Sequence, residues 1–115
     1  MENRTALIHR KEVAMGQQGF LPVRDTIEYF LRENDVKSAL KLVESFPESQ
    51  RYAEEELMRV KCIESGWPEQ AHEVGKLIGK DLTMDELKHI LHVNVARGHE
   101  TNIRKTKELI AAATN

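Results

Sequence analysis

Apolar residues recur at helical spacing along most of the chain. Val36, Ala39, Leu40 and Val43 occupy positions i, i+3, i+4 and i+7, which is the pattern of one buried helix face. Five further segments carry such a face: Ile27, Phe30 and Leu31; Ala53, Leu57 and Val60 with Met58, Cys62 and Ile63 beside them; Ala71, Val74, Leu77 and Ile78; Leu87, Ile90 and Leu91; and Ile103, Leu109 and Ile110. The pattern predicts an all-α protein of about six helices.

Residues that begin or end helices separate these faces. Asp35 is a candidate N-cap, and the pairs Asp25 with Glu28 and Thr83 with Glu86 have the spacing of a capping box. Other boundary signals are a candidate cap at Ser49, Pro68 at a first helical position, and Asn34, Gly66 and Gly98 at helix ends. The signals divide the chain into short helices with tight connections.

The first 24 residues have a weaker pattern. They contain the apolar residues Ala6, Leu7, Ile8, Val13, Ala14 and Met15. This segment is either a short helix that covers one end of the bundle or a disordered extension, and "GQQGFLP" is expected to be a connection. We therefore divide the chain into an N-terminal extension or capping helix, residues 1–24, and a helical domain, residues 25–114.

Three boundary residues are equally spaced. Asn34, Gly66 and Gly98 follow one another at intervals of 32 residues. Apolar residues recur at the same distances from each of them: Leu31, Ile63 and Val95; Ala39, Ala71 and Ile103; and Phe46, Ile78 and Ile110. This register predicts three antiparallel helical hairpins, arranged either as a right-handed repeat superhelix or as a compact helical bundle.

The segments "NDVKSALKL" and "GWPEQAHEV" are similar to tetratricopeptide-like helical repeats, in which the turn residue precedes a small alanine by five residues. The resemblance covers about residues 20–114. It implies that the first helix of each hairpin lines a concave groove, which holds a segment of a partner protein. The residues that this assigns to the groove are Arg24, Glu28, Glu56, Val60, Lys88 and His92. Alternatively, Arg24, Glu56 and Lys88 pair with one another across neighbouring helices.

Composition and charge narrow the function classes. The chain has 115 residues, a formal net charge of -2 and 5% aromatic residues. This balance suits one soluble domain and argues against nonspecific binding to a phosphate backbone. Residues 88–107 are locally basic, however, through Lys88 and through Arg97, Arg104, Lys105 and Lys107. A nucleic-acid-associated regulator that uses this stretch is therefore the alternative to a protein-binding adaptor.

No pattern typical of an enzyme is present. There is no nucleophile–base order or phosphate-binding glycine loop, and His89 and His92 have no third metal ligand patterned beside them. We expect no catalytic residue, cofactor or metal. The single Cys62 and the lack of a long apolar stretch predict a cytoplasmic protein that does not bind a membrane. A protein partner is what the resemblance to tetratricopeptide-like repeats implies.

Overall fold

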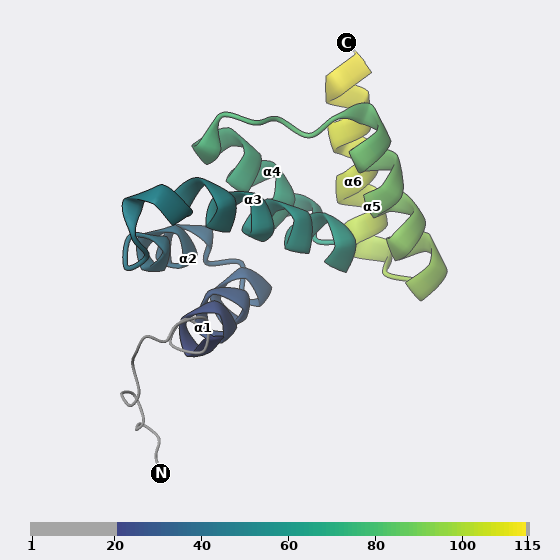
Figure 1. Ribbon diagram of the computed structural model, residues 1–115. Coiled ribbons are helices and arrows are strands. Elements are labelled where there is room, and N and C mark those ends of the chain that lie inside the picture. The colour runs from purple at the N-terminus through teal and green to yellow at the C-terminus, as the bar shows by residue number, and fades with distance from the viewer. Residues whose placement is uncertain (1–20, 115) are drawn as a thin grey trace. The chain divides into compact units, whose positions relative to one another are not determined.

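The computed structural model describes residues 21–114, and over this range it is all-helical, without strands (Figure 1). The helices are α1, Leu21–Arg32; α2, Val36–Val43; α3, Glu48–Ser65; α4, Pro68–Ile78; α5, Met84–Arg97; and α6, Glu100–Thr114. The predicted all-α class with about six helices is confirmed. The predictions for residues 1–20 lie outside the described residues.

The described residues form two units, and the division falls within α3, after Ser49. In the first unit α1 packs against α2. Its buried apolar residues are Ile27, Leu31, Val36, Ala39, Val43 and Phe46. The Asp35 side chain accepts a hydrogen bond from the Ser38 backbone N–H at 3.3 Å, so the predicted cap of α2 is confirmed.

The predicted start of α1 is wrong. The helix begins at Leu21, so Asp25 lies inside it and is not its cap, and the end of "GQQGFLP" is helical and not a connection. Pro22 fits this start because a proline in the first helical turn removes an N–H that has no partner within the helix. The Pro22 carbonyl accepts a hydrogen bond from the Thr26 hydroxyl at 2.9 Å.

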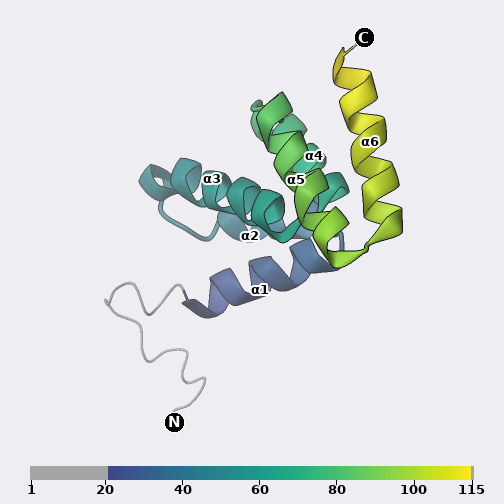
Figure 2. The same cartoon turned by 90° about the vertical axis from the view of Figure 1, so that its right-hand side faces the viewer.

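In the second unit α5 lies along α6, and α4 also contacts α6. Figure 2 shows α5 and α6 running in opposite directions from the turn at Gly98. The buried apolar residues of this unit are Met58, Cys62, Ile63, Ala71, Val74, Leu87 and Ile90. The pairing of adjacent helices in both units agrees with helical hairpins.

The predicted apolar face of α3 is only half right. Met58, Cys62 and Ile63 are buried, but Leu57 is 54% exposed and Val60 is 40% exposed. The helix also begins at Glu48, two residues earlier than a cap at Ser49 predicts, so Ser49 is not its cap. Because α3 has apolar residues on two sides, its sequence does not decide which side faces the core.

Arg59 fixes α3 to the segment between α4 and α5. Its side chain is 2% exposed. The guanidinium donates hydrogen bonds to the carbonyl oxygens of Lys80 and Asp81, each at 2.9 Å, and to both carboxylate oxygens of Glu86. Glu86 also accepts from the Thr83 backbone N–H at 2.9 Å, which completes the predicted capping box of α5. A buried arginine is tolerated here because its donors have partners.

The turns at Asn34, Gly66 and Gly98 have the same backbone geometry. Their φ angles are 62°, 76° and 69°, all in the left-handed region. At each turn this residue donates its N–H to the carbonyl three residues before it, and the next residue donates to the carbonyl of the fifth residue before itself, at 2.8–3.1 Å. This is the Schellman arrangement of a helix C-terminus. The three predicted helix ends are therefore confirmed.

Candidate partner-binding surface

The outer side of α5 carries a mixed stripe of polar and apolar residues. Lys88, His92 and Val95 are spaced by four and three residues, so they lie on one side of the helix, and all three are exposed. Val95 is 57% exposed. The start of this helix is fixed by the capping box, in which the Thr83 hydroxyl oxygen accepts from the Glu86 backbone N–H at 3.1 Å. We call Lys88, His92 and Val95 the α5 stripe.

A second exposed stripe lies on α3. It contains Tyr52, which is 68% exposed, together with Leu57 and Val60. Val60 lies one helical turn after Leu57 and Glu56, so the apolar side chains surround a carboxylate. We call Tyr52, Glu56, Leu57 and Val60 the α3 stripe. Two large apolar side chains within one helical turn create more exposed apolar surface than a single scattered residue.

Glu56 has its charge partner close by. The Lys80 ammonium lies 3.1 Å from each Glu56 carboxylate oxygen, and its geometry makes a hydrogen bond with Oε1 only. The partner of Glu56 is therefore Lys80 and not Lys88, which was the sequence-based alternative. The ammonium of Lys88 stays at the surface of α5.

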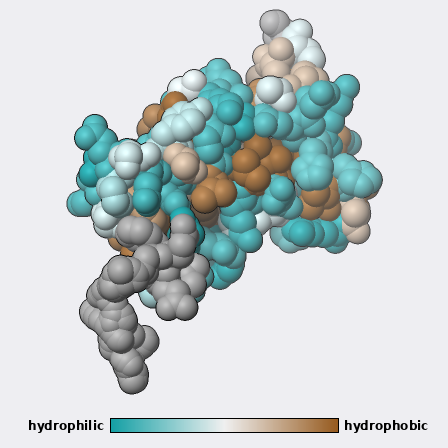
Figure 3. Space-filling model, in the orientation of Figure 1, coloured by the Kyte–Doolittle hydropathy of each residue, from teal (hydrophilic) through white to brown (hydrophobic). Residues whose placement is uncertain are grey.

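Helices α3 and α5 are neighbours. The Arg97 guanidinium donates to the Ser65 carbonyl at 2.8 Å, and the Asn94 amide donates to the Gly66 carbonyl at 2.8 Å. Asn94 is 1% exposed, so the hydrogen bond from its side chain to Gly66, the residue that follows α3, is buried. Figure 3 shows apolar side chains gathered over α3 and α5 on the face that these helices present to the viewer.

The predicted groove residues divide between the two units. Glu56, Lys88 and His92 belong to the second unit, whereas Arg24 and Glu28 are on α1 in the first. Cζ of Arg24 lies 5.9 Å from the centroid of the Phe46 ring, which is a cation–π distance. Glu28 forms an ion pair with Arg32 at 3.2 Å. The surface that we describe is therefore that of α3 and α5 alone.

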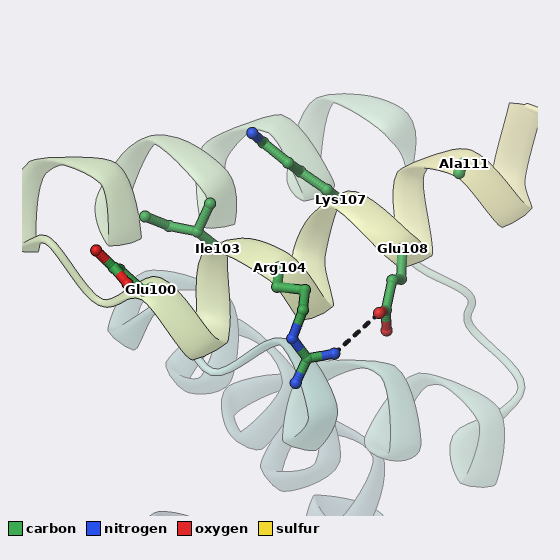
Figure 4. A pocket seen from close by; sticks show the side chains of 6 residues that line it. All are labelled: Glu100, Ile103, Arg104, Lys107, Glu108 and Ala111. Carbon is green, nitrogen blue, oxygen red and sulfur yellow. Dashed lines mark hydrogen bonds and ion pairs between the residues drawn. The ribbon is translucent and has the colours of Figure 1, made fainter.

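The basic residues of the alternative site do not form one patch. Arg97 is bonded to the end of α3. On α6, Arg104 pairs with Glu108 at 2.9 Å, and Lys105 pairs with Glu69 of α4 at 2.8 Å. Arg104 and Lys105 are consecutive and therefore point about 100° apart around the helix. Lys107 is exposed and lines the same shallow pocket as Arg104, but the two side chains point away from each other (Figure 4). The charges of Arg104 and Lys105 are therefore balanced by carboxylate partners, and the four basic side chains do not share one face.

Among residues 21–114, the titratable groups form no other candidate site. Burial raises the pKa of the Cys62 thiol to about 12, which makes it a poor nucleophile. Between residues 21 and 114, no three side chains of His, Cys, Asp or Glu are grouped so that they could hold a metal ion. None of the helices described is both long enough and apolar enough to cross a membrane.

The sequence predicts only part of the apolar side of this surface. The register places Val60 at the groove position that Glu28 and His92 share, but Leu57 is predicted on the buried face and Tyr52 has no predicted role. Val95 occupies the register position of Leu31 and Ile63, which are buried, and so its exposure could not be read from the repeat. The one available signal was the presence of apolar residues on more than one side of α3.

Comparisons with protein-family models, curated proteins and solved structures gave no match to this chain.

Proposed function

We propose that this protein is a protein–protein interaction module, an adaptor that binds a segment of a partner protein across the α3 and α5 stripes. The observation that carries the proposal is the exposure of Tyr52, Leu57, Val60 and Val95. These are four of the six large apolar side chains that are exposed among the described residues, and they lie on two neighbouring helices. Clustered exposed apolar residues with polar neighbours are typical of protein-binding surfaces.

The residue types support a peptide-like ligand. Tyrosine is among the residues that contribute most to protein interfaces, because it buries a large area and keeps a hydrogen-bonding group. Leu57 and Val60 offer apolar contacts beside it, and the Lys88 ammonium on α5 offers an ionic contact to the same segment. The partner segment would therefore present apolar side chains to α3 and an acidic group to α5.

The equal spacing of the turns is further support. Asn34, Gly66 and Gly98 share φ angles and hydrogen bonds at intervals of 32 residues, as expected of a tetratricopeptide-like repeat. In such a repeat, α3 and α5 are first helices of successive hairpins, which is where the resemblance puts the groove. We propose that the protein acts in the cytoplasm, where a reduced buried thiol such as Cys62 is the ordinary state.

Affinity capture with paired variants tests the proposal. The chain and its Val60→Asp and Val95→Asp variants are immobilised, and the proteins that they retain from native lysate are compared by quantitative mass spectrometry. A specific partner is then purified and titrated by calorimetry. We expect each variant to weaken its binding at least about tenfold, which corresponds to about 1.4 kcal/mol.

Leu77→Asp is the matched control. Leu77 is 50% exposed, which is similar to Val60 and Val95, but it lies on α4 outside both stripes. Its variant should bind the partner as the unaltered chain does. Equal retention by all four proteins, or an equal loss in the Leu77 variant, would contradict the proposed surface.

Retention on heparin tests the alternative function. A nucleic-acid regulator would be held tightly, with strong salt dependence, and would be released by replacement of Arg104 and Lys105. We expect weak retention at physiological salt, because both side chains have carboxylate partners in the structure.

A further inference from the structure

The outer side of α6 is a second surface, separate from the α3 and α5 stripes. Its residues are Glu100, Ile103, Arg104, Lys107, Glu108 and Ala111, which line a shallow pocket of about 480 Å³. Figure 4 shows that all six come from one side of α6. We call these residues the α6 stripe.

The charges of the α6 stripe are balanced but incompletely paired. Arg104 and Glu108 pair with each other one helical turn apart. Glu100 and Lys107 are exposed, and no hydrogen bond or ion pair joins either side chain to another of residues 21–114. Ile103 lies near the middle of the interval between them. The stripe thus has an available acid at one end, an available base further along and an apolar side chain between them.

We propose that the α6 stripe binds the α6 stripe of a second copy of the chain, with the two helices antiparallel about a twofold axis next to Ile103. Glu100 and Lys107 are equally distant from a point between Ile103 and Arg104. When the helix direction is reversed about that point, Glu100 of each copy lies opposite Lys107 of the other. One twofold axis therefore forms both ion pairs, as an isologous interface requires.

The charge order favours a second copy over other occupants. A nucleic acid that contacted the cationic side chains of Arg104 and Lys107 would also lie beside the carboxylates of Glu100 and Glu108, which repel its phosphates. When the helix direction is reversed, the opposite charge faces both Glu100 and Lys107, and Ile103 lies opposite Arg104 of the second copy. A contact between single helices is smaller than the roughly 1,200 Å² that standard interfaces bury, so the dimer is expected to be weak and concentration-dependent.

Sedimentation equilibrium of the full chain tests this pairing. The mass should rise with loading concentration from 13.2 kDa towards twice that value. Glu100→Lys and Lys107→Glu each place like charges opposite each other, so each single variant should stay monomeric. The double variant exchanges the charges and should recover the association of the unaltered chain. This recovery distinguishes direct pairing from general damage to the helix. Circular dichroism of each variant measures its helix content and so detects such damage independently.

Two variants outside the α6 stripe act as controls. Lys88→Glu makes the same charge change as Lys107→Glu but on α5, and it should leave association unaltered. Val60→Asp, which tests partner binding, should do the same. A chain that stays monomeric at every concentration, single variants that associate normally, or a double variant that fails to recover would each overturn the proposal.

Discussion

Replacement of Arg59 by alanine should destabilise the second unit by about 3 kcal/mol. Loss of one partner from a buried ion pair costs about 3–5 kcal/mol. The lower end applies because the Glu86 side chain is 29% exposed and can be hydrated when the guanidinium is gone. The carbonyl oxygens of Lys80 and Asp81 also lose a charged donor, each worth about 1.5–3 kcal/mol where water cannot replace it.

Urea unfolding measures this loss. Trp67 is the only tryptophan and lies in the second unit, so its fluorescence follows the part of the chain that contains Arg59. With a denaturant slope of about 1.5 kcal/mol per molar, the midpoint should fall by about 2 M. Arg59→Lys should recover part of the loss, because a single ammonium cannot span both carbonyls and the carboxylate.

Arg104→Ala is the matched control. Like Arg59, Arg104 forms an ion pair with a glutamate, but its partner Glu108 lies one helical turn away and the pair is at the surface. The Arg104 and Glu108 side chains are 61% and 64% exposed. Exposed pairs of this kind contribute about 0.2–1 kcal/mol, so the midpoint should barely move. Equal midpoints for Arg59→Ala and Arg104→Ala would refute the reasoning, since burial is the difference between the two sites.

Three further predictions concern acid stability, turn geometry and thiol access. Burial alone would raise the pKa of Glu86, but hydrogen bonds from the arginine guanidinium and from a backbone N–H, with the guanidinium charge, hold it below its ordinary value. As the pH falls, the Glu86 carboxylate is therefore protonated in the unfolded chain before it is protonated in the folded chain. The free energy of unfolding should decrease as the pH drops below about 4.3, the ordinary pKa of a glutamate. In urea titrations Glu86→Gln should lose less stability than the unaltered chain over that range, and equal losses would contradict the assignment. Gly66→Ala should be more destabilising than Gly98→Ala. A Cβ added at Gly66 would lie 2.8 Å from Cγ1 of Val93, whereas a Cβ added at Gly98 would have no surrounding atom within 4 Å. The left-handed strain of about 1–2 kcal/mol is common to both, so similar unfolding midpoints would argue against the contact. Cys62 should react with a thiol reagent only as fast as the protein unfolds, and rapid labelling of the folded chain would contradict its burial.

Local signals with a backbone mechanism could be read from the sequence. The cap at Asp35, the capping box of Thr83 and Glu86, and the left-handed turns all depend on a few neighbouring residues, and the structure has each of them. The start of α1 is not predicted correctly because the sequence allows two starts. Asp25 and Glu28 have the spacing of a capping box, but Pro22 also permits a helix that begins earlier. Local reasoning therefore located the ends at the three turns and the starts of α2 and α5, but it missed the starts of α1 and α3.

Arg59 and Val60 show why side-chain burial was harder to predict. An arginine is ordinarily exposed and a valine buried, but here Arg59 is 2% exposed and Val60 is 40% exposed. The partners of Arg59 lie more than 20 residues away, on the segment from Lys80 to Glu86. No pattern within α3 reveals them. Burial of the arginine follows from contacts that form only when α3 meets the start of α5, and this meeting also determines which side of α3 is left outside.

The same limit explains why the sequence predicts only part of the candidate surface. Leu31, Ile63 and Val95 occupy one register position and are all apolar, yet they are 1%, 7% and 57% exposed. A repeat assigns a residue to a side of its helix, but the side is buried only if another element covers it. An apolar side chain in a position that is buried elsewhere in the chain, and exposed once, is therefore a better indication of binding than an isolated exposed residue. For this reason Val95→Asp is the more discriminating variant in the partner-binding test, since the substitution alters an exposed contact and leaves the packed core untouched.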